Sequence, residues 1–546
     1  MQFLMINLNP NFSTWVLTVA TFLSGVAGCR PQAAADEAVR VGTKSQATAY
    51  ETLPPEVEEV EQPESTPEAV GGSQRTVIRG DLASVDWESM RGRQVTIEGN
   101  LTIVDTFNLA RYGEIKVARG RLYVPTSRID PNDADPNGVS FEGGSNVAKV
   151  IAAKKRNDTG VLTIDDGRDS QNVFPPRLFP NLGGTLPTVR VGSVIKSVTG
   201  RIVEKQNRLV LVPGGPLKWI PAKRPSRPNV GDAEVTVASF NVLNYFTTID
   251  DGANRARGAD SASEFKRQGA KIVSAITALD ADVIGLMEIE NNANAEQRLI
   301  AALNQASGKD VFRGCGIPKG FRDAPGGGDA IRVALIYRAD RVSPVGNVAM
   351  VRDRTFHLAR TPVVQEFKPT RGGKSFTVVV NHFKSKGSSN ADVANKDKGD
   401  GQGAYNAARR AQALAIVKFV KQLTKAERNA RVLILGDLNA YQQEDPIDAL
   451  RASGLVDLVS AKRSASRDAT THYSFLYRGQ SGSLDHAFAT KALAKDVTGV
   501  ATWHINADEP RFLDYNEEYN PRSLFKPDPF RSSDHDPVLI GIRNQP

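Results

Sequence analysis

Strand-like segments that run directly into acidic, amide or histidine side chains recur six times between residues 233 and 543 of this 546-residue chain. The polar residues are Asn241 after VTVASF, Glu288 after DVIGLM, Asn381 and His382 after FTVVV, Asp437 and Asn439 after RVLILG, Asp485 and His486 after GSL, and Asp534 and His535 before PVLIGI. A cap or a turn explains any one of these residues taken singly. Six such positions together predict that the side chains line one cleft.

The same part of the chain alternates between strand-like and helix-like patterns. Apolar runs typical of strands cover residues 234–240, 283–287, 330–337, 376–380, 432–435 and 538–542. Apolar residues with helical spacing cover 264–279 and 402–423. This alternation predicts an α/β sandwich over residues 233–543.

Residues 75–225 have a different character. Short β-prone runs at 95–97, 101–104, 114–117, 120–124, 161–164 and 189–212 are separated by Gly and Asp-Gly turns. No long helix is apparent there, so we expect a small all-β domain, best described as an OB-like barrel. A structural β domain without a ligand fits the pattern as well. Residues 226–232, at the end of a Pro- and Gly-rich stretch, predict a linker.

The first 28 residues predict a signal peptide. The apolar run WVLTVATFL at residues 15–23 is too short to span a bilayer, and Val26-Ala27-Gly28-Cys29 resembles a bacterial lipobox, which predicts lipidation of Cys29. The absence of Lys and Arg before the apolar run disagrees with this, and cleavage nearby with release of a secreted protein is the alternative. Residues 29–74, rich in Glu and Pro, predict a disordered tether. The expected location is the outer surface or the periplasmic side of a bacterial membrane.

The charge of the chain is unevenly distributed. The formal net charge is +8, yet residues 30–75 hold four basic and nine acidic side chains, which leaves an excess of 13 positive charges on the rest. A positive charge of this size outside residues 30–75 favours polyanionic partners, although a generally soluble basic protein carries a similar charge. Two cysteines, Cys29 and Cys315, exclude a disulfide framework and a cysteine-based zinc site.

The residue types of the predicted cleft suit metal-assisted hydrolysis of a phosphate ester. Carboxylate and amide oxygens suit a hard cation such as Mg²⁺, which neutralises charge on phosphorus. Histidine can exchange a proton or donate to phosphate near neutral pH, and a carboxylate can orient or deprotonate water. Neither a phosphate-binding loop of the Walker A type nor an HExxH zinc motif is present. From residue types alone, either Asp437 or His535 can be the base.

The motifs resemble a known superfamily. SFNVLNYF, DVIGLMEIENN, NHFKSKGSS, LILGDLNAY, GSLDHAF and RSSDHDPV are similar to the motifs of the endonuclease/exonuclease/phosphatase superfamily, with its DNase I-like fold. More narrowly, the chain resembles secreted bacterial nucleases of the ExeM/NucH type over roughly residues 75–543. The resemblance implies an α+β or α/β fold, a four-layer sandwich of two β-sheets flanked by helices, preceded by the OB-like domain.

The resemblance also implies a metal side of the cleft. Glu288 would be the principal ligand of a divalent cation, Mg²⁺ with Mn²⁺ or Ca²⁺ as alternatives. Asn241 would assist the metal or the phosphate, and Asp534 would be a second carboxylate on this side.

The catalytic side follows from the same motifs. Asp437 would orient the attacking water, with Asn439 beside it on the phosphate. Asp485 would pair with His535, and His535 and His382 would contact the scissile phosphate.

A second tier of residues has weaker support. Lys384, Lys386 and Arg409 are candidates for phosphate binding, with a solvated helix face as the alternative. Tyr245, Tyr405 and Tyr473 can stack on sugars or bases or pack in a core. His486, next to Asp485 on a strand, should face the opposite way and be structural. The resemblance makes Arg478 an unexpected positive charge near Asp485, and Ala404 stands where relatives often carry a cysteine.

The expected function is therefore a metal-dependent extracellular nuclease that acts on DNA, or less preferably on RNA. A sphingomyelinase-like phosphodiesterase, a small-molecule phosphatase and a non-catalytic surface protein that binds nucleic acid are the alternatives.

Overall fold

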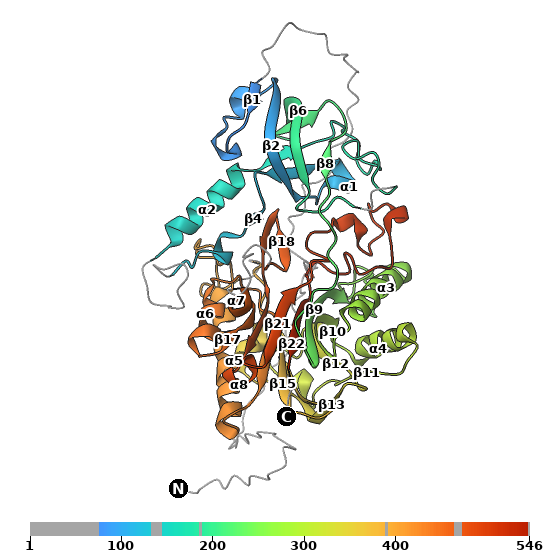
Figure 1. Cartoon of the computed structure of the whole chain (residues 1–546), viewed down its shortest axis with the longest axis vertical. Coiled ribbons are helices and arrows are strands. Elements are labelled where there is room, and N and C mark those ends of the chain that lie inside the picture. The colour runs from blue at the N-terminus through green and yellow to red at the C-terminus, as the bar shows by residue number, and fades with distance from the viewer. Residues whose placement is uncertain (1–75, 133–144, 185–187, 388–390, 464–471, 544–546) are drawn as a thin grey trace, which may run out of the picture.

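The computed structural model describes the chain except residues 1–75, 133–144, 185–187, 388–390, 464–471 and 544–546 (Figure 1). The predicted signal peptide, the tether and Cys29 lie outside the described residues. Within the described part, none of the helices combines the length and the apolar character needed to cross a bilayer. Figure 1 shows a β domain at one end of the molecule and a larger sandwich at the other.

The N-terminal domain is built on one sheet. Its strands are β1 (Thr76–Ile78), β2 (Gln94–Asp105), β3 (Ile115–Ala118), β5 (Leu162–Ile164), β6 (Val194–Lys205), β7 (Arg208–Pro213) and β8 (Trp219–Ile220), in the order β1-β2-β3-β5-β7-β6-β8. An additional pairing of β2 with β6 closes five of these strands into a ring around an apolar core. This closed sheet has the form of a small barrel; its assignment as an OB-like fold stays a prediction.

A helix interrupts this domain where the sequence pattern shows no sign of one. α2 (Val147–Thr159) has 13 residues, against our expectation of no long helix, and it follows the short α1 (Leu109–Tyr112). Val150 is the one residue of α2 that is fully buried. The sequence prediction was wrong here because a helix that buries so little lacks the apolar spacing by which helices are recognised.

The second part consists of two six-stranded sheets. In the described residues the first has the order β11-β12-β10-β9-β22-β21 and the second β13-β14-β15-β16-β20-β17. The first comprises β11 (Phe312–Gly314), β12 (Ile331–Arg338), β10 (Val283–Glu290), β9 (Val235–Tyr245), β22 (Val538–Ile542) and β21 (Val497–Thr502). The second comprises β13 (Val342–Met350), β14 (Val363–Pro369), β15 (Phe376–His382), β16 (Val432–Asp437), β20 (Asp485–Ala489) and β17 (Val456–Asp457).

Helices cover the outer face of each sheet. α3 (Ala262–Leu279) and α4 (Ala293–Ser307) share a core with the first sheet, and α5 (Asn406–Ala426) and α6 (Asp445–Ala452) share one with the second. A third core, built from both sheets, lies between them. The short α7 (Leu458–Arg463) and α8 (Lys491–Ala494) complete this part. The expected four-layer sandwich is confirmed.

Local chemistry explains where these helices begin and end. Ser261 Oγ accepts a hydrogen bond from Glu264 N at the start of α3, and Asn292 caps α4 in the same way. α4 ends at Gly308, whose φ of 64° suits glycine. The edge strand β13, in contrast, was missed because most of its side chains are exposed.

A third, small sheet joins the two parts. β18 (Phe475–Tyr477) and β19 (Gln480–Gly482) form a hairpin of the sandwich, and β19 pairs in parallel with β4 (Leu122–Tyr123) of the N-terminal domain. β18 accordingly lies between the two parts in Figure 1. The two domains are thus connected by backbone hydrogen bonds as well as by side chains.

Candidate active site

The ends of five strands bring the predicted polar residues together. β9 runs parallel to β10, and β15 runs parallel to β16, so the carboxyl ends of each pair lie at one edge of their sheet. The two sheets also approach closely beneath this edge, since a Cβ on Gly285 would lie 2.6 Å from Leu435 and 2.9 Å from Val380. The side chains that follow these strands therefore face one another across the sandwich.

Glu288 lies at an irregular point of β10. The register with both neighbouring strands shifts between residues 286 and 289, and Glu288 has a φ of 64°. Such a bulge re-aims a side chain, and a non-glycine residue in this region of φ is held there by its surroundings. Asn244 N donates to Glu288 Oε2 at 3.1 Å, and Asn241 Nδ2 donates to Glu288 Oε1 at 3.1 Å.

Glu288, His382 and Asp437 form a compact cluster. One ligand atom from each of the three lies within 4.8 Å of the others. His382 Nε2 is 3.4 Å from Asp437 Oδ2 and 3.9 Å from Glu288 Oε1. The sequence placed Glu288 on the metal side and the other two on the catalytic side, whereas the structure joins all three.

Burial sets the protonation of this cluster. It raises the pKa of Glu288, helped by the charge of Asp534, and raises the pKa of Asp437 to about 7 against the opposing pull of His535. Burial, with the nearby charges of Arg360 and His535, lowers the pKa of His382 well below its usual range. Two buried carboxylates, whose negative charges are unfavourable without a partner, and one neutral imidazole are a set of ligands that fits a divalent cation.

Asn241 was expected to assist the metal or the phosphate, and that role stays a prediction. Its Oδ1 accepts from Leu243 N at 3.0 Å, which turns its Nδ2 toward Glu288 and, at 3.4 Å, toward Asp437 Oδ2. As it lies here, Asn241 donates to two carboxylates and orients them. Asp534 is half-buried beside the cluster and raises the pKa of Glu288, but it is outside the three-residue group.

His535 and Asp485 form a second unit beside this cluster. His535 Nδ1 lies 2.8 Å from Asp485 Oδ2, and Ser474 Oγ donates to the same oxygen at 2.6 Å. Burial alone would lower the pKa of His535, but the carboxylates of Asp485 and Asp437 outweigh it and raise that pKa well above its usual range. Phe475 packs against the imidazole with ring centroids 4.7 Å apart. The ring is held in one orientation and carries a positive charge.

Asn439 is hydrogen-bonded to Asp437 of the cluster. Its backbone N donates to Asp437 Oδ1 at 2.8 Å, and its Nδ2 donates to Phe383 O at 3.2 Å. The φ of Asn439 is 48°, a value that asparagine tolerates better than most residues. The turn thereby fixes the Asp437 carboxylate on one side and presents an amide on the other.

His486 lies apart from the cluster, as the alternation along β20 predicts. It is buried, and its Nε2 lies 2.8 Å from Ala440 O. Burial lowers its pKa, which keeps it neutral. Its structural role is consistent with these contacts.

The three basic residues predicted to bind phosphate differ in accessibility. Lys384 is half-buried, with Nζ 4.5 Å from the ring centre of Tyr405. Lys386 pairs with the buried Glu444, and Arg409 is fully buried, donating to the carbonyls of Ala404 and Gln402. Lys384 is therefore the most accessible of the three, and its role as a phosphate contact stays a prediction, whereas the contacts of Lys386 and Arg409 support the loop.

Two arginines near the site had no signal in the sequence. Arg360 donates to Phe383 O at 3.2 Å, and its charge lowers the pKa of His382; the charge of Arg257 acts in the same direction. Both approach Asp329, at 3.6 and 3.5 Å. They follow no strand and belong to no motif that we recognised, so only the folded chain reveals them.

Two of the three tyrosines proposed to stack on nucleotides pack against other aromatic side chains of the protein. Tyr245 is buried against Phe265, and Tyr473 stacks on His504 with centroids 4.0 Å apart. Arg478 lies in the turn after β18, with its guanidinium 5.5 Å from the centre of the Tyr477 ring. Packing accounts for Tyr245 and Tyr473.

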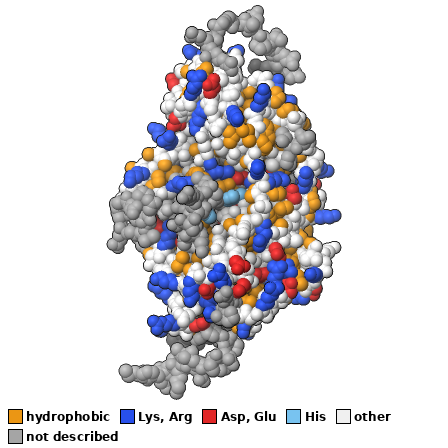
Figure 2. Space-filling model, viewed as in Figure 1, with side chains coloured by type: hydrophobic (Ala, Val, Ile, Leu, Met, Phe, Trp, Pro, Cys, Tyr) orange, Lys and Arg blue, Asp and Glu red, His pale blue; other side chains and the backbone are white. Residues whose placement is uncertain are grey.

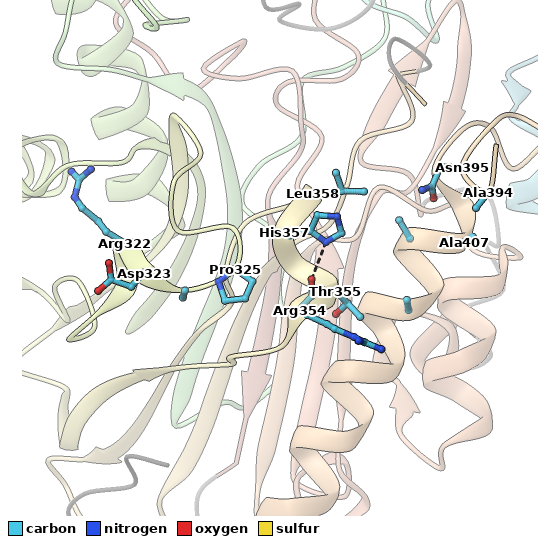
Figure 3. Close-up of a pocket in the computed structure, with 13 residues that line it drawn as sticks. Arg322, Asp323, Pro325, Arg354, Thr355, His357, Leu358, Ala394, Asn395 and Ala407 are labelled. Carbon is cyan, nitrogen blue, oxygen red and sulfur yellow. Dashed lines mark hydrogen bonds between the residues drawn. The ribbon is translucent and has the colours of Figure 1, made fainter. Parts of the chain in front are cut away.

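A separate hollow has a volume of about 680 Å³ (Figure 3). It is lined by η4 (Phe321–Asp323) with its flanking loop, by η5 (Arg354–Leu358) and by α5. Figure 3 shows His357 on η5, where its Nδ1 lies 2.9 Å from Arg354 O. None of the proposed catalytic or metal-binding residues lines this hollow. Histidine side chains do appear near the middle of the face in Figure 2, with basic side chains around them.

The fold and the site together define a phosphoesterase hydrolase. The sequence profile of the endonuclease/exonuclease/phosphatase family matches residues 238–535, more than half of the chain. The chain therefore belongs to this family, and the broad class predicted from the motifs is confirmed.

Solved structures that resemble the chain share little sequence with it. The human nocturnin catalytic domain is 17% identical, with 58% of this chain and 97% of that domain covered and a TM-score of 0.37. A mannosyl-6-phosphatase from Bacteroides thetaiotaomicron is 17% identical, with 56% and 99% covered and a TM-score of 0.36. TDP2 from C. elegans is 14% identical, with 57% and 75% covered and a TM-score of 0.34. A search of curated proteins gave no significant match.

Proposed function

We propose that this protein is a metal-dependent extracellular nuclease that hydrolyses phosphodiester bonds in DNA, with RNA as a secondary substrate. The observation that carries the proposal is the juxtaposition of the Glu288–His382–Asp437 cluster with the His535–Asp485 pair, whose nearest approach is 3.9 Å between His535 Nε2 and Asp437 Oδ2. A resemblance to secreted nucleases of the ExeM/NucH type supports the same conclusion.

Glu288 and Asp437, with neutral His382, are the residues that would hold the cation. Mg²⁺ is the first candidate, with Mn²⁺ and Ca²⁺ as alternatives, and when bound it neutralises negative charge on the phosphate. Asn241 orients both carboxylates, and Asp534 adds negative charge from the same side.

The raised pKa of His535 indicates which group donates a proton to the substrate. His535 donates one N–H to Asp485, and its raised pKa keeps a second proton on Nε2 that can be donated to a phosphate oxygen. The pKa of Asp437, about 7, is that of the protein without a cation, and a bound cation competes with the proton, so Asp437 is charged when it holds the cation. Because His535 in this form has no free nitrogen to accept a proton, we propose that Asp437 orients the attacking water, with Asn439 beside it.

Positive charge beside the cluster favours a polyanionic substrate. Arg360, Arg257 and Lys384 all contribute to the lowered pKa of His382, so their charges lie close to the place where a phosphate would bind. The excess of 13 positive charges outside residues 30–75 acts over a longer range. Large exposed apolar side chains of the described sandwich are Val393, Leu414, Tyr477 and Tyr519, which lie on separate segments. They offer no paired apolar surface for a lipid substrate.

The proposal includes export. The apolar run before Cys29 and the lipobox-like sequence support a lipoprotein on the outer surface or the periplasmic side of a bacterial membrane, with release as a secreted protein as the alternative. Metabolic labelling with a fatty acid tests it, because Cys29→Ser is expected to lose the label.

The test of the activity uses supercoiled plasmid. The full chain is incubated with Mg²⁺, with EDTA, and as the His535→Ala variant with Mg²⁺. We expect nicking with Mg²⁺ alone. An intact plasmid with Mg²⁺, Mn²⁺ and Ca²⁺ contradicts the endonuclease; linear DNA, RNA, sphingomyelin and 4-nitrophenyl phosphate then separate an exonuclease, a lipid phosphodiesterase and a phosphatase.

A further inference from the structure

Three consecutive residues before and within β18 contact the catalytic pair and its surroundings. Ser474 Oγ donates to Asp485 Oδ2, and Phe475 packs against the ring of His535. Tyr473 stacks on His504, whose Nδ1 lies 2.9 Å from Asp536 Oδ2. The position of this segment therefore decides how the His535 imidazole is held.

The N-terminal domain holds this segment in place. β19, the partner strand of β18, is paired with β4 through the registers of Gln480 with Leu122 and Ser481 with Tyr123. Val124 N donates to Ser481 O at 3.0 Å. The hairpin that carries the contacts to His535 is thus an extension of a strand from another domain.

Arg121, next to β4, makes the most contacts at this junction. Its guanidinium pairs with both oxygens of Asp508, at 2.8 and 3.1 Å, and donates to Ser481 Oγ at 3.0 Å. It also lies over the ring of Tyr473, 4.4 Å from its centre, and Tyr473 donates its hydroxyl proton to Asp508 Oδ2 at 2.7 Å. One side chain of the N-terminal domain therefore contacts Tyr473, just before β18, and Ser481, on β19.

A second arginine reinforces the same arrangement. Arg190 is fully buried; it donates to His504 O at 2.8 Å and lies 3.5 Å from Asp508. On the far side, Asp536 N donates to Ser474 O at 2.7 Å. The contacts from Arg121 to His535 are continuous, and each is between buried or half-buried groups, where geometry is well defined.

We infer that Arg121 is a positioning residue for the proposed phosphodiester hydrolysis: through Tyr473 and the β18–β19 hairpin it fixes the His535–Asp485 pair, so the N-terminal domain completes the active site. This inference rests on the proposed function. Arg121 touches neither His535 nor the carboxylate cluster in any contact described above, so its effect is on geometry. A catalytic group misplaced by about 1 Å costs up to ~100-fold in rate.

The test compares Arg121→Gln with Arg119→Gln in the full chain. Arg119 is a matched control because it donates to Gly80 O and Glu98 O, within the N-terminal domain alone. Hydrolysis of bis(4-nitrophenyl) phosphate and nicking of plasmid are measured with Mg²⁺. We expect kcat to fall ~10- to 100-fold in Arg121→Gln with KM within about twofold of the wild-type value, and little change in Arg119→Gln. Equal kcat in wild type and Arg121→Gln overturns the inference.

A double-variant cycle separates positioning from general instability. If Arg121 acts through His535, adding Arg121→Gln to His535→Ala causes no further loss of the residual activity. A further loss as large as the one in the wild-type background overturns the inference. Tyr473→Phe, which removes one hydroxyl, gives a milder variant and is expected to show a smaller fall in kcat of the same kind.

Amide hydrogen exchange tests the structural step without any substrate. Peptides covering residues 472–485 are expected to exchange faster in Arg121→Gln than in wild type and Arg119→Gln. Unchanged exchange overturns the inference even where kcat falls. A wild-type protein that cleaves no phosphodiester contradicts the proposed function instead, and the exchange data still decide whether Arg121 holds the hairpin.

Discussion

His535 Nδ1 lies 2.8 Å from Asp485 Oδ2, while Nε2 of the same ring lies 3.9 Å from Asp437 Oδ2. One imidazole therefore stands between two buried carboxylates. The nearer carboxylate fixes the orientation of the ring and keeps it charged, and the other nitrogen remains directed toward the cleft. This arrangement explains how a histidine buried from solvent can still be a proton donor.

Asp485→Asn is expected to lower kcat by roughly 100- to 10,000-fold, because the amide no longer stabilises the charged form of His535. Steady-state hydrolysis of plasmid or bis(4-nitrophenyl) phosphate measures the effect, with circular dichroism to verify folding. The control is His357→Asn, on an exposed histidine of η5. An Asp485→Asn protein within twofold of wild type would show that the pair plays no part in the reaction.

Glu288→Gln is expected to weaken binding of Mn²⁺ by at least ~10-fold, since the substitution preserves size and removes the charge. Isothermal titration calorimetry measures the affinity independently of activity. Glu88→Gln serves as the control, because the exposed Glu88 pairs with Arg91 and belongs to neither of the groups that could hold a metal ion. Equal affinities in wild type and Glu288→Gln would place the cation elsewhere.

Asp437 makes the metal-free protein less stable as the pH rises. Its pKa in the folded protein, about 7, lies above the value of 3.8 in an unfolded chain, so the folded state binds the extra proton. The stabilising contribution is complete below about pH 4 and is lost as the pH rises through 7. Raising a pKa by one is worth about 1.4 kcal/mol, so an effect of a few kcal/mol is the upper limit.

The measurement is urea unfolding in EDTA at pH 5 and pH 8. The free energy of unfolding of Asp437→Asn minus that of wild type is expected to be larger at pH 8 than at pH 5. The variant is thus relatively more stable at the higher pH. Mn²⁺ should raise the melting temperature of wild type more at pH 8 than at pH 6, because the cation competes with the proton. A relative stability independent of pH would contradict the raised pKa.

Arg360→Gln is expected to raise KM for DNA several-fold and to reduce the slope of log(kcat/KM) against log(salt concentration) by about 1, the value for one lost phosphate contact. Rates between about 50 and 300 mM NaCl give the slope. Arg352→Gln, on an exposed arginine that donates to Gly320 O, is the matched control. An unchanged slope for Arg360→Gln would show that this arginine supports the loop around Asp329 and does not meet the substrate.

Much of the sandwich could be predicted from the sequence. The strand predicted at 538–542 coincides with β22, and the helix predicted at 264–279 coincides with α3 to within two residues. β22 is buried throughout and α3 along one face, and burial leaves a continuous apolar run in such a strand and a period of 3.6 residues in such a helix. α2 and β13 show no such apolar pattern because most of their side chains face solvent.

The sequence predicted which residues lie at the site better than it predicted how their side chains are arranged. Motif resemblance pointed to Glu288, Asp437 and His535, and the structure brings these three residues close together; their roles stay predictions. The direction of the Asn241 amide was not predictable, because it depends on one hydrogen bond from Leu243 N. The burial of Arg409 was not predictable either. Its hydrogen-bond acceptors are backbone carbonyls, which every residue carries, so no residue type in the sequence marks them.

The sequence by itself determined the alternation of strands and helices, the family and the set of polar residues at the strand ends, because these depend on local periodicity and short motifs. Tertiary structure alone decided that Arg360 and Arg257 lie beside His382, and that Arg121 reaches Asp508 across 387 positions of the chain. Contacts between residues so far apart leave no periodic trace, since they are specified by the packing of whole domains.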